Sequence, residues 1–373
     1  MIICDLDKCT GCGVCYSVCP VKCISMEYDQ QGFLFPKVDD DKCIKCNRCR
    51  EKCPSLNIVE NINFSNPTTV GCWHKNEEIL KQSSSGGAFT ALSEYIFKNN
   101  GVVIGCVMDD NLTPYHTVAT NLDELKPMRG SKYLQSEIRD IYIKTKELLD
   151  EQVMVLFTGC PCQIAGLYVY LNERYSNLIT VDLICHGVGS KAFFDRYIEE
   201  MGSKYGDDIR GVSFRNKIKN KKNYITKISF KNRPNVYLPA ISDPYMSCYI
   251  QRLIYRESCY NCMYASIPRT GDFSIGDFVG IDRKVLSKED FQRGVSVLLL
   301  NNKNANKLFE KINMNLNWVE RPLDEATSTN ANIYKSSVRP ESRTEIFSTD
   351  ISPFEARKKY CKNLFKGRIV NFI

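Results

Sequence analysis

A duplicated cysteine motif in the first 54 residues strongly restricts how that part of the chain can fold. Residues 9–20 read CTGCGVCYSVCP and residues 43–54 read CIKCNRCREKCP. Both copies have the spacing Cys-x2-Cys-x2-Cys-x3-Cys-Pro of two-cluster bacterial ferredoxins, in which the fourth cysteine binds the other cluster. The spacing therefore predicts a ferredoxin-type module with two 4Fe-4S clusters at residues 1–60.

Each 4Fe-4S cube needs four thiolates, three from one loop and one from the other copy. We assign Cys9, Cys12, Cys15 and Cys53 to the first cluster, and Cys43, Cys46, Cys49 and Cys19 to the second. A pair of zinc sites is the alternative, because zinc also binds Cys-x2-Cys pairs. Zinc does not call for two four-cysteine runs that each end in proline, so clusters are favoured. Cys4 and Cys23 lie outside the repeat and are expected to be small buried residues.

The composition agrees with a metal-binding protein. The 373 residues include 19 cysteines but only 3 histidines. Disulfide scaffolds are short secreted chains, whereas this chain shows no signal peptide and no apolar run near the roughly 20 residues of a membrane span. We therefore expect a cytoplasmic protein without a membrane span. A net charge of +7 is mild for this length and gives no reason to expect nucleic acid as a partner.

Beyond the module the chain alternates strand-like and helix-like segments. Residues 61–69 read as a linker, residues 70–340 as one domain and residues 341–373 as a C-terminal extension. Strands are expected at Val70–His74, Val102–Val107, Val153–Phe157, Leu178–Cys185 and Tyr224–Phe230, and helices at Gly86–Lys98, Pro161–Leu171 and Ser190–Met201 with a turn at Thr158–Gly159. The predicted class is α+β, a ferredoxin module followed by a mixed α/β flavin-binding catalytic domain.

Two loops of this domain have the composition of phosphate sites. SSSGGAF at 83–89 opens a helix whose amides could receive a phosphate, although such a segment is more often a plain cap. RGSKYLQS at 129–136 places Arg129 and Lys132 around Gly130 and could bind a pyrophosphate, or could be a solvated turn.

Four further cysteines could bind a third cluster: Cys162, Cys185, Cys259 and Cys262. From spacing alone they could equally be buried residues or zinc ligands, and Cys160 competes with Cys162 for the ligand role. We expect Cys72, Cys106, Cys248 and Cys361 to be structural.

The segments SSSGGAFTAL, RGSKYLQS, LFTGCPCQIAGL, VDLICHGVGS, VSFRNK, CYNCMYA and GDFSIGDFVGI resemble coenzyme F420 hydrogenase and dehydrogenase beta subunits, over nearly all of residues 70 to about 340. The resemblance implies FAD and a third 4Fe-4S cluster on Cys162, Cys185, Cys259 and Cys262, with Cys160 in a variable position. It implies flavin contacts at Ser85, Gly86, Gly87, Gly130, Ser131, Lys132, Tyr133, Arg215 and Lys217.

These features predict an oxidoreductase. Clusters carry single electrons and a flavin exchanges either one electron or a pair, so we expect electrons to pass from a ferredoxin or flavodoxin through the clusters to FAD and on to a small organic substrate, or in reverse. His186 and Lys132 are the candidate proton donors. An electron-transfer adaptor subunit and a genuine coenzyme F420 dehydrogenase are the alternatives, and the substrate and a homo-oligomer are left open.

The run FRNKIKNKKNYITKISFKNR at 214–233 contains eight basic and no acidic residues. Such a run could steer an acidic electron donor, or could be the solvated face of a hairpin, which is the more common case.

Overall fold

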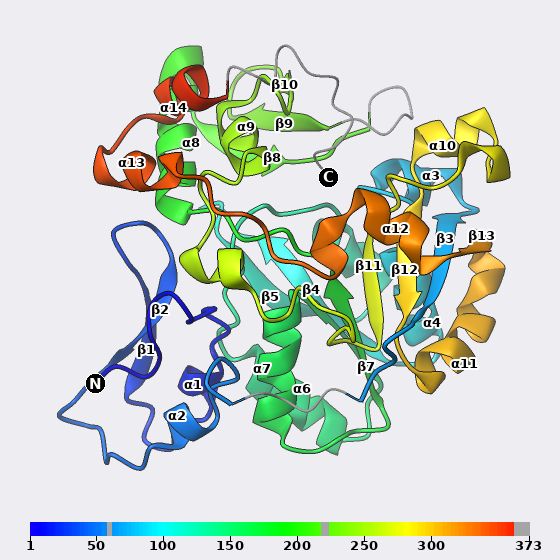
Figure 1. Ribbon diagram of the computed structural model, residues 1–373, viewed down its shortest axis with the longest axis horizontal. Coiled ribbons are helices and arrows are strands. Elements are labelled where there is room, and N and C mark those ends of the chain that lie inside the picture. The colour runs from blue at the N-terminus through cyan, green and yellow to red at the C-terminus, as the bar shows by residue number, and fades with distance from the viewer. Residues whose placement is uncertain (58–61, 218–223, 362–373) are drawn as a thin grey trace.

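The computed structural model describes residues 1–57, 62–217 and 224–361. Its N-terminal module joins two short helices and one antiparallel hairpin: α1 (Val14–Ser17), β1 (Ile24–Tyr28), β2 (Leu34–Val38) and α2 (Arg48–Glu51). Each short helix lies within one copy of the cysteine motif. The module occupies the lower left of Figure 1, beside the remainder of the chain.

An eight-stranded sheet forms the centre of the remainder. Its strands are β3 (Thr68–His74), β4 (Val102–Met108), β5 (Pro114–Ala119), β6 (Val155–Gly159), β7 (Leu178–Leu183), β11 (Phe273–Asp277), β12 (Ser296–Leu300) and β13 (Leu316–Arg321). The order is β13-β3-β12-β11-β7-β6-β4-β5. The pairs β4/β6, β6/β7 and β7/β11 are parallel, whereas the flanking pairs are antiparallel. Parallel strands are normally covered on both faces, and every residue of β6 is buried.

Helices cover both faces of this sheet. They are α3 (Glu77–Gln82), α4 (Ala88–Lys98), α5 (Leu122–Leu125), α6 (Ile141–Asp150), α7 (Pro161–Leu171), α10 (Lys288–Arg293), α11 (Lys303–Ile312) and α12 (Leu323–Thr329), with 3-10 turns at Lys126–Met128, Glu257–Asn261, Arg283–Val285, Asn313–Asn315 and Ala331–Ile333. Because side chains alternate along a strand, Leu156 of β6 packs with α4 and α11, while Val155 and Phe157 pack with α6 and α7. Helix α1 joins that second core.

A second layer lies above the sheet in Figure 1. It contains an antiparallel sheet of β8 (Ile209–Ser213), β9 (Ile225–Phe230) and β10 (Val236–Pro239), and the helices α8 (Lys191–Tyr205), α9 (Pro244–Ile250), α13 (Ser342–Ser348) and α14 (Pro353–Tyr360). Its core is rich in aromatic side chains, including Phe193, Tyr197 and Tyr245. No helix in the described ranges is both long and apolar enough to cross a bilayer.

The element types expected in the catalytic domain are confirmed, with shifted ends. The helix expected from residue 86 starts only after Gly87, whose φ of 86° makes it the N-cap. Thr158 and Gly159 close β6 instead of forming a turn. Strand β7 ends at Leu183, so Cys185 lies in the loop that follows.

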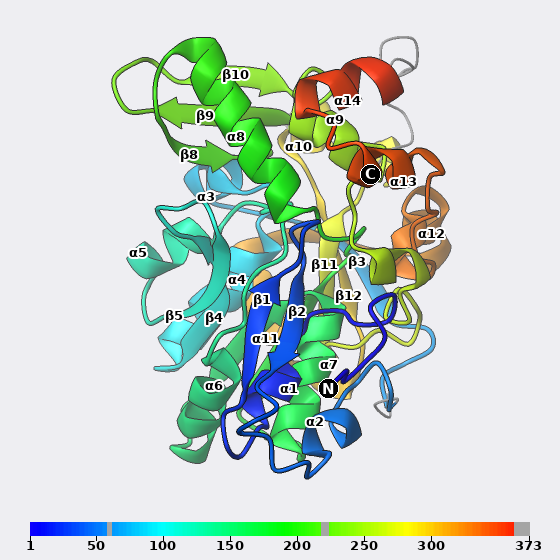
Figure 2. The same cartoon turned by 90° about the vertical axis from the view of Figure 1, so that its left-hand side faces the viewer.

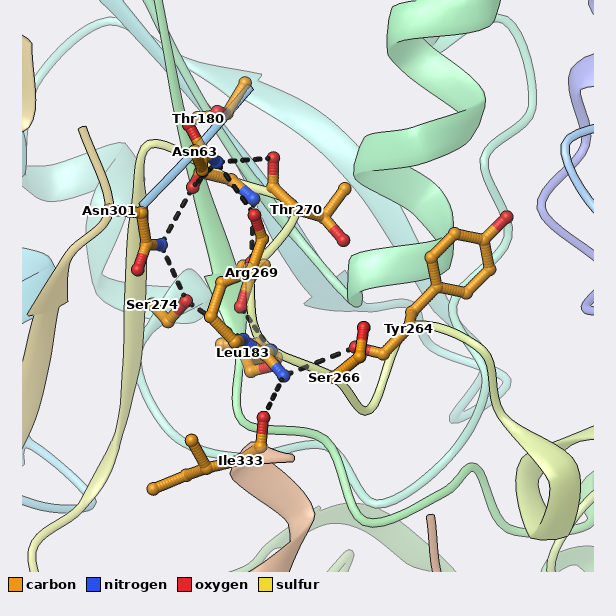
Figure 3. Close-up of polar contacts among 12 residues, drawn as sticks. Asn63, Thr180, Leu183, Tyr264, Ser266, Arg269, Thr270, Ser274, Asn301 and Ile333 are labelled. Carbon is orange, nitrogen blue, oxygen red and sulfur yellow. Dashed lines mark hydrogen bonds and ion pairs between the residues drawn. The ribbon is translucent and has the colours of Figure 1, made fainter. Parts of the chain in front are cut away.

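The expected linker at 61–69 is only partly a connecting segment. Asn61 lies outside the described residues, and the sheet already begins at Thr68. Between them, the Asn63 side chain donates to the carbonyls of Arg269 (2.8 Å) and Gly271 (2.9 Å) (Figure 3), and Phe64 N–H donates to Asn301 O (2.7 Å). This segment is therefore fixed against the larger domain.

Arg256 holds the first cysteine loop against that domain. Its side chain is 1% exposed, and it donates from Nε to Cys9 O (2.7 Å) and from Nη1 to Leu34 O (2.9 Å). Gln135 accepts from Arg256 and donates to the carbonyls of Thr10 and Gly11. Backbone carbonyls of the cysteine loop thus accept hydrogen bonds from buried side chains of the larger domain.

We expect Arg256→Gln to destabilise this contact strongly. A hydrogen bond to a charged group contributes about 1.5–3 kcal/mol, and each kcal/mol moves Tm by roughly 2–4 °C in a domain of this size. Thermal unfolding of the anaerobically purified protein should show a Tm lower by about 5 °C or more. Arg339→Gln, which removes a partly exposed ion pair with Glu257, should have a small effect, because such pairs contribute about 0–1 kcal/mol. Equal shifts in the two variants would contradict the role of Arg256.

Candidate iron-sulfur and cofactor site

The fold gathers the thiols expected to bind the first cluster. Burial raises the pKa of Cys12 to about 12, and the neighbouring thiols of Cys9 and Cys53 add to this effect. Burial also raises the pKa of Cys15, and the thiols of Cys12, Cys9 and Cys53 raise it further. Thiols this buried ionise only with compensating positive charge, and a coordinated metal supplies it. Cys4 is buried beside Cys9 and Cys53.

The second expected set is Cys19, Cys43, Cys46 and Cys49. The Cys49 thiol interacts with those of Cys46 and Cys19. Cys23 is buried against this set, with its sulfur 3.5 Å from that of Cys19. Cys46 is exposed, unlike every thiol of the first set.

The third expected set surrounds a void of about 40 Å³. Cys162, Cys185, Cys259 and Cys262 all line it, together with Cys160. These thiols are supplied by the start of α7, the loop after β7 and the turn at Glu257–Asn261 with the residue that follows it. Ser258 Oγ also lines the void and is buried without a hydrogen-bond partner among the described residues. Four thiols and an unsatisfied hydroxyl suit a 4Fe-4S cube, whose sulfurs accept hydrogen bonds.

In the ranges that the structure describes, which include every cysteine, no three Cys, His, Asp or Glu side chains converge as one metal ion would require. A cube distributes its four protein ligands over four irons, so its ligands need not meet at one point.

Two tyrosines lie between the first and third sets. Burial raises the pKa of Tyr264, and so do the thiols of Cys12 and Cys53 on one side and of Cys162 and Cys262 on the other. Tyr142 is buried between the same sets and donates to Cys12 O (3.0 Å) and to Gln163 O (2.8 Å). The sets are therefore direct neighbours across the contact between the module and the larger domain.

Arg269 fixes the segment that follows Cys262. Its side chain is completely buried, pairs with Asp182, and donates to the carbonyls of Tyr264 (3.3 Å) and Ile333 (3.2 Å) (Figure 3). A hydrogen bond from Cys160 lowers the pKa of Cys185, with smaller contributions from Gly187 N–H and from the Arg269 charge. The sequence analysis missed Arg269 because no local motif marks it.

A second, larger cavity of about 310 Å³ adjoins the third set. Cys160, Cys185 and His186 belong to the walls of both cavities. Most residues expected to contact a flavin line the larger cavity: Ser85, Gly87, Gly130, Ser131, Lys132, Tyr133 and Arg215.

Gly86 and Lys217 do not line this cavity. A Cβ on Gly86 would lie 2.1 Å from Cys72 O, so this glycine allows the loop to rest on β3. Lys217 Nζ donates to the carbonyls of Leu80 (2.6 Å) and Ser85 (2.7 Å). Both residues hold the loop from outside the cavity.

Arg215 lines the cavity and bridges two of its walls. Its guanidinium pairs with Asp277 (2.6 Å), donates to Tyr133 OH (3.1 Å) and lies 4.2 Å from the centre of the Tyr224 ring. It therefore joins the 129–136 loop to strand β11 and does not belong to a surface patch.

Burial lowers the pKa of both candidate proton donors, but to different values. Burial, followed by the charge of Arg252, lowers the pKa of His186 to about 4, so the ring is neutral near pH 7 and offers a single N–H. Burial lowers the pKa of Lys132 to about 8, and its ammonium donates to the carbonyls of Pro127 (2.7 Å) and Met128 (3.0 Å). Lys132 is thus the group that titrates closest to neutral pH. His116, missed by the sequence analysis, also lines the cavity and is neutral, because burial lowers its pKa to about 4.

The large cavity is strongly cationic. Four basic side chains line it, Arg129, Lys132, Arg215 and Arg252, against one carboxylate, Asp277. Arg252 is half-buried beside His186, and its side chain has no hydrogen bond or ion pair within the part of the chain that the structure describes. The sequence analysis missed Arg252. This excess of positive charge favours an anionic ligand.

The other cysteines occupy different surroundings. Cys72 is fully buried in β3, and the sulfurs of Cys248 and Cys361 lie 4.0 Å apart. Cys106 lines the large cavity, so it is not simply a core residue.

The basic run at 214–233 does not form one surface patch in its described part. Arg215 and Lys217 point inward, Arg233 packs on the Tyr205 ring, and Lys231 lies near Asp208. Residues 218–223, with Lys219, Lys221 and Lys222, lie outside the described residues.

Fold and site together define an iron-sulfur protein of the oxidoreductase class. Family models specify it further: a 4Fe-4S dicluster domain matches residues 8–57, and the N- and C-terminal domains of the coenzyme F420 hydrogenase/dehydrogenase beta subunit match residues 69–141 and 153–326. The chain belongs to this beta subunit family, as its motifs predicted.

Several relatives come from Methanocaldococcus jannaschii. A coenzyme F420-dependent sulfite reductase is 29% identical over 170 residues, 44% of this chain and 25% of that protein. An uncharacterized protein is 23% identical over 201 residues, 45% of this chain and 54% of the relative. An uncharacterized ferredoxin is 39% identical over 58 residues, 16% of this chain and 74% of the ferredoxin. The chain thus spans a quarter to about half of the first two relatives.

One solved structure has a related outline. A chain of the F420-reducing [NiFe] hydrogenase complex from Methanosarcina barkeri has a TM-score of 0.48 and 17% identity, covering 81% of this chain and 94% of that chain.

Proposed function

We propose that the protein is an iron-sulfur flavoprotein that transfers single electrons from a ferredoxin or flavodoxin through three 4Fe-4S clusters to FAD, for two-electron reduction of an organic substrate or for its reverse. One observation supports this route above the others. Tyr264 lies between the third thiol set and the first set. On the other side, Cys185 and His186 line both the void of the third set and the large cavity. Electrons can then pass between neighbouring sites without leaving the protein.

For the third cluster we propose Cys162, Cys185, Cys259 and Cys262 as ligands. Cys160 then serves as a hydrogen-bond donor to Cys185, because its thiol contacts that sulfur. The hydrogen bonds of Arg269 hold the segment after Cys262 in place, and the charges of Arg269 and of its partner Asp182 act on Cys185 in opposite directions.

In the large cavity we propose FAD, which supplies the exchange between single electrons and electron pairs. Gly87 and Gly130 leave room for close approach, and Arg129 and Lys132 provide charge for its phosphates. Lys132, with a pKa of about 8, can supply a proton near neutral pH. His186 can donate one hydrogen bond from its neutral ring. Arg252, which lacks a protein partner in the described part, would bind an anionic group of the substrate.

A genuine coenzyme F420 dehydrogenase is the second candidate. Membership of the F420 hydrogenase/dehydrogenase beta subunit family favours it. It differs from the first proposal only in the organic partner, so turnover with purified coenzyme F420 separates the two.

Iron analysis tests the number of clusters. We expect about 12 iron atoms per chain, four for each of three clusters. Cys162→Ser should remove about four of them and leave the ferredoxin-type signals in electron paramagnetic resonance spectra. Cys160→Ser is the matched control, since this thiol lines the same void but should not be needed for binding. Equal iron loss in the two variants would show that the ligand assignment is wrong.

Two glycine variants test the flavin site. Gly130 and Gly206 have φ of 84° and 66°, and a Cβ at either position meets no atom within 4 Å. Alanine should therefore cost roughly 1–2 kcal/mol of backbone strain at each position. Only Gly130 lines the cavity, so Gly130→Ala should weaken flavin binding about tenfold or more, as measured by flavin content and by titration of the deflavinated protein. Gly206→Ala should keep its flavin; parallel loss in both variants would assign the effect to strain alone.

Electron delivery can be followed directly by flavin bleaching. Reduced ferredoxin should bleach the flavin of the wild-type protein, and Cys162→Ser should slow this step by about 100-fold, or ~2.7 kcal/mol in the barrier, with the N-terminal clusters still reduced. Unimpaired bleaching in that variant would remove the third cluster from the route. A wild-type protein that accepts electrons yet reduces organic compounds only with a second polypeptide would be an adaptor.

A further inference from the structure

The three thiol sets differ in their access to solvent. All four cysteines of the first set are 7–8% exposed, and those of the third set are partly exposed where they line the void. Only the second set has an exposed member, Cys46. An electron carrier in solution therefore approaches closest to the internal route at the second set.

The two copies of the cysteine motif have the same backbone turns but different residues in them. Gly11 and Gly13 have φ of 65° and 77° in the first copy; Lys45 and Asn47, at the equivalent positions, have φ of 55° and 58° in the second. Gly11 is required because a Cβ there would lie 2.3 Å from Gln135 Nε2. Lys45 is exposed and carries a side chain in a conformation that favours glycine. The motif has the same turn in both copies, and the exposed second copy has room for a side chain there.

Lys45 is one of several exposed residues on the two loops that flank the second set. Ile44 is 61% exposed and Val21 is 39% exposed, on the two loops that flank the second set. Lys22, Lys45 and Arg48 are exposed on the same loops. We call Val21, Lys22, Ile44, Lys45 and Arg48 the second-set face.

The charges of the second-set face are not neutralised by the protein. Within the described ranges the side chains of Lys22, Lys45 and Arg48 form no ion pair or hydrogen bond. The acidic residues nearby are partly engaged: Asp39 pairs with Lys42 (2.8 Å) and Asp40 with the N-terminal ammonium (3.0 Å). Asp41 and Glu51 flank the basic loop at residues 42–50, which itself contains no acidic residue.

We propose that the second-set face is the docking surface for an acidic one-electron carrier protein of the ferredoxin or flavodoxin class. The exposed apolar side chains can exclude water at the contact, and the basic side chains attract and orient an acidic partner. One electron leaves the reduced carrier and enters the protein at this end. The inference rests on the proposed function, since it locates the donor of that electron route.

This position differs from the one expected for the basic run at 214–233. In Figures 1 and 2, α1 and α2 lie at the bottom of the molecule and β8–β10 lie at the top. The run at 214–233 follows β8 and contains β9. A carrier bound beside β8–β10 would be remote from the second set.

The test measures binding of an oxidised acidic ferredoxin to the anaerobically purified holoprotein by calorimetry at low ionic strength. Lys22→Glu/Lys45→Glu/Arg48→Glu should raise Kd about tenfold or more, because steering charges are reversed, and the difference should shrink at high salt as charges are screened. Lys303→Glu/Lys307→Glu/Lys311→Glu reverses three exposed charges on α11 and should leave Kd unchanged. The same result is expected for Lys219→Glu/Lys221→Glu/Lys222→Glu.

A single variant keeps the test independent of folding. Lys45→Gly removes one charge and relieves the left-handed strain, so Tm should stay equal or rise while Kd increases about two- to threefold. Wild-type iron content in every variant confirms that clusters are intact. An unchanged Kd in both second-set variants, or weakening only in the 219–222 variant, would overturn the proposal.

The hypotheses of the docking surface and of the proposed function can be refuted independently. Dithionite-reduced methyl viologen needs no docking surface, so it should bleach the flavin equally in wild type and in the triple second-set variant. Bleaching by the dye with no charge dependence of Kd would refute the docking surface alone. Charge-dependent Kd with no flavin reduction from any donor would refute the proposed function alone.

Discussion

The arrangement of the redox sites depends on the burial of Arg256. A guanidinium that is 1% exposed must find its hydrogen-bond acceptors within the protein: Nε donates to Cys9 O and Nη1 donates to Leu34 O and Gln135 Oε1, whereas Nη2 has no partner among the described residues. Removing one side of such a contact leaves charged or polar groups buried without partners, which is costly. The module is consequently held in one position on the larger domain. That position brings Cys12 beside Tyr264 and the third thiol set, so the hydrogen bonds of one buried arginine hold the first and third thiol sets next to each other.

The sequence predicts the local parts of this site well and the long-range parts poorly. Cysteine spacing reflects the geometry of a loop around a cluster, so the first two thiol sets lie together as their spacing indicated. The third set, which spacing left open and the resemblance implied, lines one void. Strand and helix types also follow from local periodicity. Arg256, Arg269 and Arg252 could not be found in this way, because their roles come from contacts with residues far away in the chain. Gly86 and Lys217 show the opposite error. Both lie in segments that border the cavity, but sequence proximity does not tell which face of a loop a residue occupies.

The two cysteine motifs show how one local fold adapts to different surroundings. Their spacing and turns are the same, since each must wrap around the same kind of cluster. The first copy has glycine where the turn is pressed against Gln135. The second copy has Lys45 and Asn47 at the corresponding positions and faces solvent. Burial selects the smallest residue in one copy, whereas exposure permits a longer side chain in the other.

The basic side chains of the large cavity differ in whether the protein itself provides partners for them. Asp277 neutralises Arg215, and backbone carbonyls hold the ammonium of Lys132. These contacts fix the positions of both cations in the wall. Arg252 has no such partner in the described part, and it lies beside His186, at the end of the cavity nearest Cys185. An unpaired half-buried cation is unfavourable unless an anion occupies the site, and the neutral ring of His186 can add one hydrogen bond to such a group. In the proposed electron route, this end of the cavity lies beside the third thiol set, and an anionic group of the ligand would bind there.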